Sequence, residues 1–306
     1  MSEILTALWP VFALLCVGHG IRRLGFPGDG FWEPAEKLIY FLLFPTLLIY
    51  KLSLADVSAV PLQKVAVAIG VLLLTGTLLL ILVQKLKPIA NHSFTSVYQG
   101  GMRFNTYVGL AASAAMFGDA GLAVAAVIIA LMVPSLNLLC VLIFSLYTRR
   151  DAGFSSALLA VIKNPLILAC VIGIFLNYSG VGLPFMLQSV AGLLSGMALP
   201  LGLLAVGAGL SLSALRSAGG AVLYSSLVKL VLFPLIMLLV CLLFIESRLV
   251  AQVLLLFSAL PTASTAYVLA RQLGGDAPMM AAIITAQTLL SMLTMPFVLV
   301  FFLEFI

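Results

Sequence analysis

Ten apolar segments, each long enough to cross a bilayer, restrict this chain of 306 residues to very few architectures. An α-helix needs about twenty apolar residues to span the hydrocarbon core, whereas a transmembrane β-strand shows about ten residues of alternating polarity. The chain is 63% hydrophobic and 8% charged, too few charges to cover a water-facing surface. This excludes a soluble enzyme, a DNA-binding domain and a disordered protein. We expect an all-α membrane protein whose ten transmembrane helices occupy about residues 4–21, 37–54, 65–85, 96–117, 121–147, 158–177, 184–213, 221–245, 249–273 and 277–304.

The basic residues of the connecting loops are distributed unevenly between the two sides of the membrane. Loops on one side hold ten of them, whereas loops on the other side hold only Lys51, Lys64 and Arg248. Because cytoplasmic loops are enriched in Lys and Arg, and ten spans place both termini on one side, we predict that both termini are non-cytoplasmic. The expected location is the inner (cytoplasmic) membrane of a bacterium. The ten cytoplasmic basic residues are Arg22, Arg23, Lys37, Lys85, Lys87, Arg149, Arg150, Lys163, Arg216 and Arg271.

The two halves of the chain resemble each other at an offset of 155 to 157 residues. Residues 1–150 and 151–306 would then be two five-span repeats, and an odd number of spans makes the second repeat inverted, as in many secondary transporters. The alternative is ten unrelated hydrophobic helices. The matched pairs are Pro10 with Pro165, Gly18 with Gly173, Pro45 with Pro200, 125–130 with 281–286, and Gly118-Asp119-Ala120 with Gly275-Asp276-Ala277.

Spans 4 and 9 are the best candidates for a binding site, because each contains a polar run rich in small residues, 99–109 and 258–267. Pro261 lacks a backbone donor and Gly109 weakens its helix. A broken helix frees backbone groups that need partners, and its exposed N-terminus suits an anion. The alternative is helix packing through small residues. The candidate binding residues in these runs are Arg103, Asn105, Thr106, Pro261, Thr262, Ser264 and Thr265.

Charged residues within the spans are all basic. The ten carboxylates lie in loops or at span ends, and the two deep charges are Arg103 and Lys229. A cation/proton antiporter needs a buried carboxylate, so the pattern favours an anionic substrate. Alternatively, either basic side chain reaches the headgroups along its long stem. Asn137 in span 5 is either a ligand donor or an interhelical bond, and the expected supporting residues are Gly109, Lys229, Thr46 and Gln287.

Several of these motifs resemble the auxin efflux carrier family. Residues 103–110, followed by Met116-Phe117-Gly118, are similar to its fourth span, and 260–263 with 267–270 are similar to its ninth. Asn164-Pro165 and Phe44-Pro45 also fit. The resemblance covers the whole chain and is closer to bacterial malate and malonate permeases than to plant carriers, whose mid-chain loop is long; here that loop is about 148–156.

The resemblance implies a fold related to bile-acid symporters and cation/proton antiporters, in which broken spans 4 and 9 cross at the midplane. It further implies a scaffold of spans 1, 2, 6 and 7 (about 4–54 and 158–213) and a moving transport domain of spans 3–5 and 8–10 (about 65–147 and 221–304). The family's substrate-facing amides correspond to Asn105 and Asn137, and a homodimer is expected. Ala112 and Ala266 stand at about the positions where the plant carriers have a second proline, which leaves the sharpness of both breaks open.

These observations predict a secondary carrier for a small organic anion, such as malate, malonate or an auxin-like acid. It would work by an elevator mechanism, most simply as a uniporter that exports the anion. The alternative is symport with protons or with sodium, which Thr106 and Thr262 would hold. No cofactor, resident metal or nucleic-acid partner is expected. Two other classes, an intramembrane enzyme and a non-transporting sensor, are the remaining alternatives, and we predict no catalytic residues.

Overall fold

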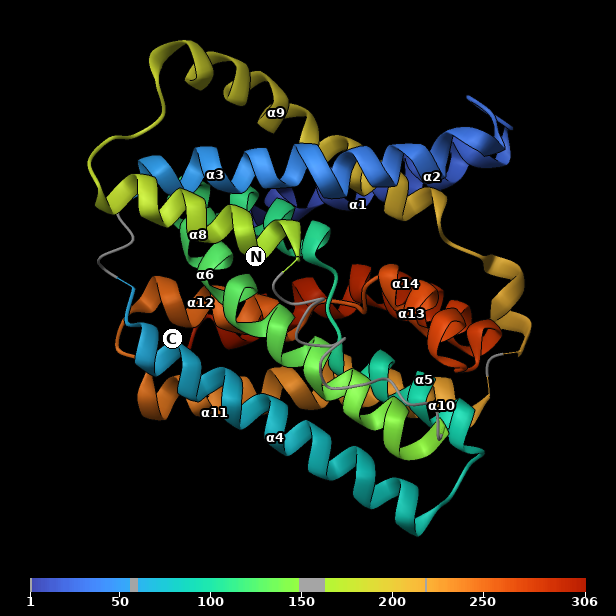
Figure 1. Cartoon of the computed structure of the whole chain (residues 1–306). Coiled ribbons are helices and arrows are strands. Elements are labelled where there is room, and N and C mark those ends of the chain that lie inside the picture. Colours follow the sequence, from blue (N-terminus) through green and yellow to red (C-terminus); the bar gives the residue numbers. More distant parts are fainter. Residues whose placement is uncertain (1, 56–59, 149–162, 218) are drawn as a thin grey trace. The chain divides into compact units, whose positions relative to one another are not determined.

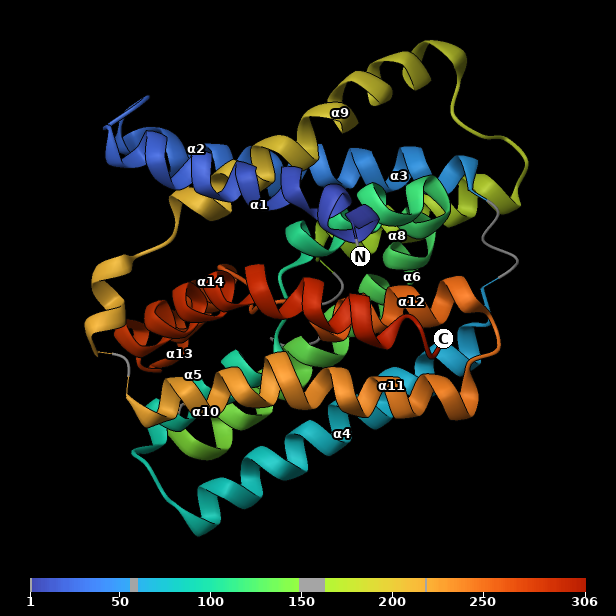
Figure 2. The same ribbon diagram turned by 180° about the vertical axis from the view of Figure 1, so that it is seen from behind.

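The computed structural model describes residues 2–55, 60–148, 163–217 and 219–306 (Figures 1 and 2). Within these ranges the chain forms helices and connecting turns without strands, which confirms the prediction of an all-α protein. Two π-helical stretches, η1 and η3, continue the helices on either side, and η2 is a 3-10 helix. The elements are α1 (Ser2–Arg23), α2 (Asp29–Leu38), η1 (Ile39–Leu43), α3 (Phe44–Leu54), α4 (Leu62–Leu86), α5 (Asn91–Met102), α6 (Thr106–Thr148), α8 (Pro165–Tyr178), α9 (Phe185–Ala208), η2 (Leu212–Ser217), α10 (Gly220–Leu227), η3 (Val228–Leu232), α11 (Phe233–Phe244), α12 (Arg248–Ser258), α13 (Thr265–Leu273) and α14 (Ala277–Phe302).

Seven stretches of the described residues are long and apolar enough to cross a membrane. Three local features explain why this number is smaller than the ten predicted spans. Predicted spans 4 and 5 fall within one stretch, Asn91–Thr148. The described part of span 6 is the 14-residue helix α8, and span 9 is divided into the short helices α12 and α13. The chain is therefore a multi-pass membrane protein, while the number ten and the inverted repeat stay predictions.

The surface of α4 is apolar in the way that a lipid-facing helix requires. Leu74, Leu78 and Leu82 are 62%, 60% and 51% exposed, and their spacing of four places them on one side of the helix. Soluble proteins rarely expose such contiguous apolar surface, so this side of the helix fits lipid rather than water.

Glycines form the turns at two interruptions of the helices. Gly118 has φ 59° and separates two helical segments within α6. Gly274 has φ 78° and ends α13 in the left-handed conformation that side chains avoid. Gly109 lies inside α6, three residues after the helix begins at Thr106, so the break itself precedes it.

The chain divides into two compact units. Unit 1 contains the described residues of Met1–Pro61, Tyr107–Ala130 and Val161–Gly209, and unit 2 contains those of Leu62–Thr106, Leu131–Ala160 and Leu210–Ile306. The predicted scaffold spans lie mainly in unit 1, which also takes Tyr107–Ala130 from the predicted transport spans. The functional division into scaffold and transport domains stays a prediction. Part of predicted span 6 and most of the mid-chain loop lie outside the described residues.

Within unit 1, α1 lies against α9 and α3 lies against α8. Glycines bring these helices into backbone contact: a Cβ atom at Gly18 would lie 2.1 Å from Leu204 O, and one at Gly173 would lie 3.2 Å from Ile49 Cα. Gly18 and Gly173 are partners in the sequence repeat, and Leu204 and Ile49 are separated by the same 155 residues. The two glycine contacts are therefore equivalent under the predicted repeat.

Unit 2 contains α4, α5 and α10 to α14, together with the second part of α6. The continuous segment α10–η3–α11 and helix α4 both have 25 residues, and α11 packs against α4 and α12. Helix α5 packs against α4, α10 and α14. These contacts surround the interrupted segments with helices.

We predict that Gly207→Ala destabilises the protein, because a Cβ atom at Gly207 would lie 2.0 Å from Leu15 O, a backbone atom. Overpacking of this kind costs about 1–3 kcal/mol, and the midpoint of thermal unfolding in detergent should fall. The matched control is Gly196→Ala on the same helix, where a Cβ atom meets nothing within 4 Å. Equal midpoints for the two variants would contradict the inferred backbone contact.

Candidate functional site

The helices break at one place in each of the two segments that were predicted to be interrupted. Helix α5 ends at Met102, Arg103 is extended (φ −70°, ψ 157°), and α6 begins at Thr106. Helix α12 ends at Ser258 and α13 begins at Thr265, with Pro261 in the intervening segment. Both breaks form although Ala112 and Ala266 stand where the family has a second proline.

The two breaks are joined to each other within unit 2 by a backbone hydrogen bond, from Asn105 N to Pro261 O over 2.7 Å. Edge-to-face packing of Phe104 on Phe257, with ring centroids 5.4 Å apart, adds an apolar contact between the two segments. Asn105 is 2% exposed. The residue that we predicted to face the substrate is therefore positioned by a backbone contact with the other break.

The side-chain amide of Gln287 in α14 bonds backbone groups from both segments. Gln287 Oε1 accepts from Thr262 N over 2.9 Å, and Nε2 donates to Gly100 O over 3.0 Å. Nε2 also lies 3.4 Å from Ser225 Oγ in α10. A group freed by a helix break is costly in an apolar interior unless it is bonded. Gln287 thus pairs a donor of one segment with an acceptor of the other.

Thr262 and Gln99 form a second link between the segments. The Thr262 hydroxyl donates to Gln99 O over 3.4 Å, and the side chains of both residues are completely buried. The carbonyl of Gln99 also accepts from Arg103 N at the end of α5. Thr262 therefore compensates the end of α5, as expected for a hydroxyl beside a broken helix.

The Arg103 guanidinium donates to Asn137 Oδ1 in the second part of α6. This bond explains both residues at once: Arg103 points to an interior amide rather than along its stem to the headgroups, and Asn137 makes an interhelical bond. Since Asn137 is uncharged, the pair keeps the full positive charge of the guanidinium. Lys229 is 0% exposed, so it too does not reach a lipid-facing surface.

The remaining predicted residues are placed differently. Ser264 and Thr265 are part of the second break, at the start of α13, where Thr265 is exposed and Ser264 makes no side-chain cap hydrogen bond. Thr106 begins α6 at the first break. Thr46 and Gly109 belong to unit 1, and so are not among the residues that unit 2 brings together.

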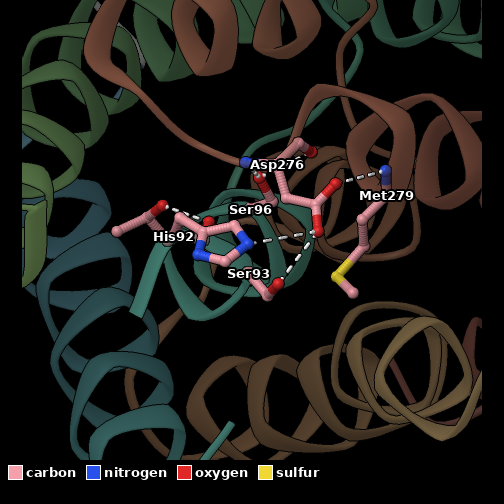
Figure 3. Close-up of polar contacts among 6 residues, drawn as sticks. His92, Ser93, Ser96, Asp276 and Met279 are labelled. Atoms are coloured by element: carbon pink, nitrogen blue, oxygen red, sulfur yellow. Dashed lines mark hydrogen bonds and ion pairs between the residues drawn. The ribbon is translucent and has the colours of Figure 1, made fainter. Parts of the chain in front are cut away.

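The other end of α5 is fixed by Asp276 (Figure 3). Its carboxylate accepts from Met279 N over 3.0 Å, which caps α14, and from Ser93 Oγ over 2.9 Å. His92 Nε2 lies 4.0 Å from the same carboxylate, and Ser96 Oγ bonds the backbone of Asp276. This carboxylate is therefore used to join the beginnings of α5 and α14.

Sequence reasoning missed two of these residues as functional candidates. In the sequence Asp276 is prominent only as part of the repeated Gly-Asp-Ala motif, although an Asp with a proline two residues later, Pro278, is a typical helix start. Gln99 stood inside the polar run of span 4, but nothing in one sequence indicates that its amide is buried. Hydrophobic periodicity cannot predict the burial of Gln99, because the neighbours that bury it come from distant segments.

The described carboxylates of unit 2, which belong to Glu246, Asp276 and Glu304, lie outside the segments that contain the breaks. Glu246, between α11 and α12, pairs with Lys64 over 2.6 Å, and this hydrogen bond and the lysine charge hold the pKa of the Glu246 carboxyl below its usual range. Among the described residues, no group of three His, Cys, Asp or Glu side chains has the arrangement of a metal site. The charge at the breaks is therefore positive, from Arg103 and from the N-terminus of α13.

The fold and the site define a multi-pass α-helical membrane protein with two interrupted helices linked through their backbones. Residues 152–299, about half of the chain, match the family described as Membrane transport protein. The matched residues include predicted span 9 and exclude predicted span 4, so over its second half the chain is similar to this family, in agreement with the resemblance to auxin efflux carriers in span 9. No curated protein matches the sequence. Because the family consists of transporters, the coarse function is membrane transport.

We predict that Gln287→Leu destabilises the protein by roughly 2–6 kcal/mol, since it leaves Thr262 N and Gly100 O without their side-chain partner, at about 1–3 kcal/mol for each buried group. Thermal unfolding in detergent would measure the loss. The control is Gln63→Leu at an exposed position of α4, where little change is expected. A Gln287→Leu variant as stable as the control would show that the amide does not compensate the breaks.

Proposed function

We propose that this chain is a carrier for a small organic anion, a carboxylate such as malate, malonate or an auxin-like acid, and that the two linked breaks of unit 2 bind it. The observation that carries the proposal is the hydrogen bond from Asn105 N to Pro261 O. It brings the Asn105 amide, the Thr262 region and the N-terminus of α13 to one place in the interior. Amide donors and helix N-termini are the groups that stabilise a carboxylate without neutralising it.

The charge balance supports an anion rather than a cation. Arg103 is bonded to a neutral amide, and the described carboxylates of unit 2 lie between helices or at the end of the chain. A cation in this place would meet like charge, and it would lack the buried carboxylate on which cation exchangers depend. An anion gains from the same arrangement.

The proposed mechanism is an elevator in which unit 2 carries the site and unit 1 serves as the scaffold, with a homodimer formed through the scaffold. The backbone contacts of α1 with α9 and of α3 with α8 support a rigid scaffold, since unit 1 packs through glycines in both places. The proposed location is the inner membrane, with both termini non-cytoplasmic. A uniporter is the simplest form: a potential of 100 mV, negative inside, contributes about 2.3 kcal/mol per charge and drives an anion outward.

Flux in proteoliposomes tests this proposal directly. The purified protein is reconstituted with malate, malonate or indole-3-acetate inside, and a potassium diffusion potential is imposed with and without sodium or a pH gradient. We expect efflux of one acid to follow the potential alone. Efflux that requires sodium or a pH gradient would replace uniport by symport, and absence of flux for every acid would refute an organic-anion carrier.

We further predict that Asn105→Ala lowers the affinity for the transported acid roughly tenfold or more, because it removes a donor to a charged group. The fold should persist, since the bond to Pro261 O uses the backbone of Asn105. Binding is measured by calorimetry and folding by thermal unfolding. Asn91→Ala, at the exposed start of α5, is the control, and equal affinity in both variants would remove Asn105 from the site.

A further inference from the structure

Two completely buried polar side chains of unit 2 lack hydrogen-bond partners among the described residues. The first is Lys229, whose Nζ has no acceptor, and the second is Gln99, whose amide is unbonded at both Nε2 and Oε1. An unbonded buried amide costs stability, and an unpaired buried ammonium costs more. A protein keeps such groups where they meet something that the folded chain alone does not supply.

Both groups lie next to the linked breaks. Ser225, four residues before Lys229, donates to Val97 O in α5 and accepts from Gln287, so this side of α10 faces the site. A Cβ atom at Gly100, the neighbour of Gln99, would lie 2.6 Å from Ser225 Oγ. Lys229 and Gln99 are therefore each within about one helical turn of the contact between Gly100 and Ser225.

Lys229 lies in the π-helical turn η3, and such turns occur frequently at functional sites. Its Nζ is 4.9 Å from the centroid of the Phe233 ring. That ring packs near Gly76 and near Met102, since a Cβ atom at Gly76 would lie 2.6 Å from the ring and 3.0 Å from Met102 Sδ. The ammonium is thus held beside the end of α5, where the first break begins.

The described elements that pack against Lys229 provide no negative charge. The helices packed against η3 are α5, α10, α11 and α14. Their sequences contain no Asp or Glu, and their titratable side chains are His92, Tyr98, Tyr224 and Cys241. Tyr98 is bonded to Thr77 in α4, and His92 lies beside Asp276 at the opposite end of α5. A bound anion would supply the countercharge that the described residues around Lys229 do not provide, and it would favour the charged form of the lysine.

We propose that Lys229 and Gln99 form a second contact point for the substrate, in which the ammonium is the countercharge of a substrate carboxylate and the amide donates to it. This inference rests on the proposed transport of an organic anion. It adds an explanation of how the site selects a charged acid over a neutral compound. Asn105 orients the acid through a neutral amide, whereas Lys229 distinguishes the carboxylate from a neutral analogue of the same shape.

The test compares Lys229→Met with Lys85→Met, a control at an exposed position in the last turn of α4. Malonate, malate and indole-3-acetate are each paired with the corresponding amide, and binding to the full-length protein in detergent is measured by calorimetry. We expect Lys229→Met to bind the acid roughly tenfold more weakly or worse, as for loss of a bond to a charged group. Binding of the amide should change little, and the control should match the wild type.

The unfolding midpoint distinguishes a binding role of Lys229 from a structural one. If Lys229 stabilised the fold, its replacement would lower the unfolding midpoint. Removing an unpaired buried ammonium should raise the unfolding midpoint of the ligand-free protein, by about 2 °C or more. Gln99→Leu should show the same combination of higher stability and weaker acid binding, with Gln63→Leu as its control. Lys229→Arg, which keeps the charge, should retain preference for the acid.

Acid affinity that is unchanged in both Lys229→Met and Gln99→Leu, while the wild type binds, overturns this inference and leaves the proposed function intact. Unfolding or destabilisation of Lys229→Met, together with loss of acid preference in Lys229→Arg, also overturns it. Wild-type protein that binds none of the acids overturns the proposed function and this inference with it.

Discussion

Everything at the centre of unit 2 depends on how the broken helices satisfy their own backbone groups. In a bilayer, a break is tolerated only where protein or water replaces the lost hydrogen bonds. Here the donor at Asn105 is satisfied by the carbonyl of Pro261, and Gln287 bonds Thr262 N and Gly100 O with one amide. The two breaks therefore compensate each other, and neither would be stable without the other.

This mutual dependence places strict demands on the helices around the breaks. Gln287 reaches Gly100 only because α14 and α5 lie close together, and a Cβ atom at Gly100 would lie 2.5 Å from Ile283 and 2.6 Å from Ser225. Asp276 fixes the beginnings of the same two helices. The alignment of α5 with α14 is thus set at one end by the Asp276 carboxylate and at the other by the Gln287 amide. This alignment determines where the residues of the breaks lie.

Much of this arrangement was predictable from the sequence. The membrane class follows from the long apolar segments, and the locations of both breaks follow from the polar runs around Asn105 and Pro261. The partners of the breaks were not predictable, because the bond between Arg103 and Asn137 and the links made by Gln287 join segments that are distant in the chain. The exact position of the first break was not predictable for a related reason: Gly109 permits a break, but packing decides that α6 begins before it, at Thr106.

The offset of the repeat clarifies why the two breaks differ in chemistry although they meet. Asn105 and Pro261 are 156 residues apart, which is also the separation of the ends of α5 and α12. The predicted repeat makes these two positions equivalent, but it does not require the same residue type at both. One break supplies a carbonyl from a proline, which has no N–H to donate, and the other supplies the donor that binds it. The bond between the two breaks therefore uses only backbone atoms, and it does not depend on which side chain stands at position 105.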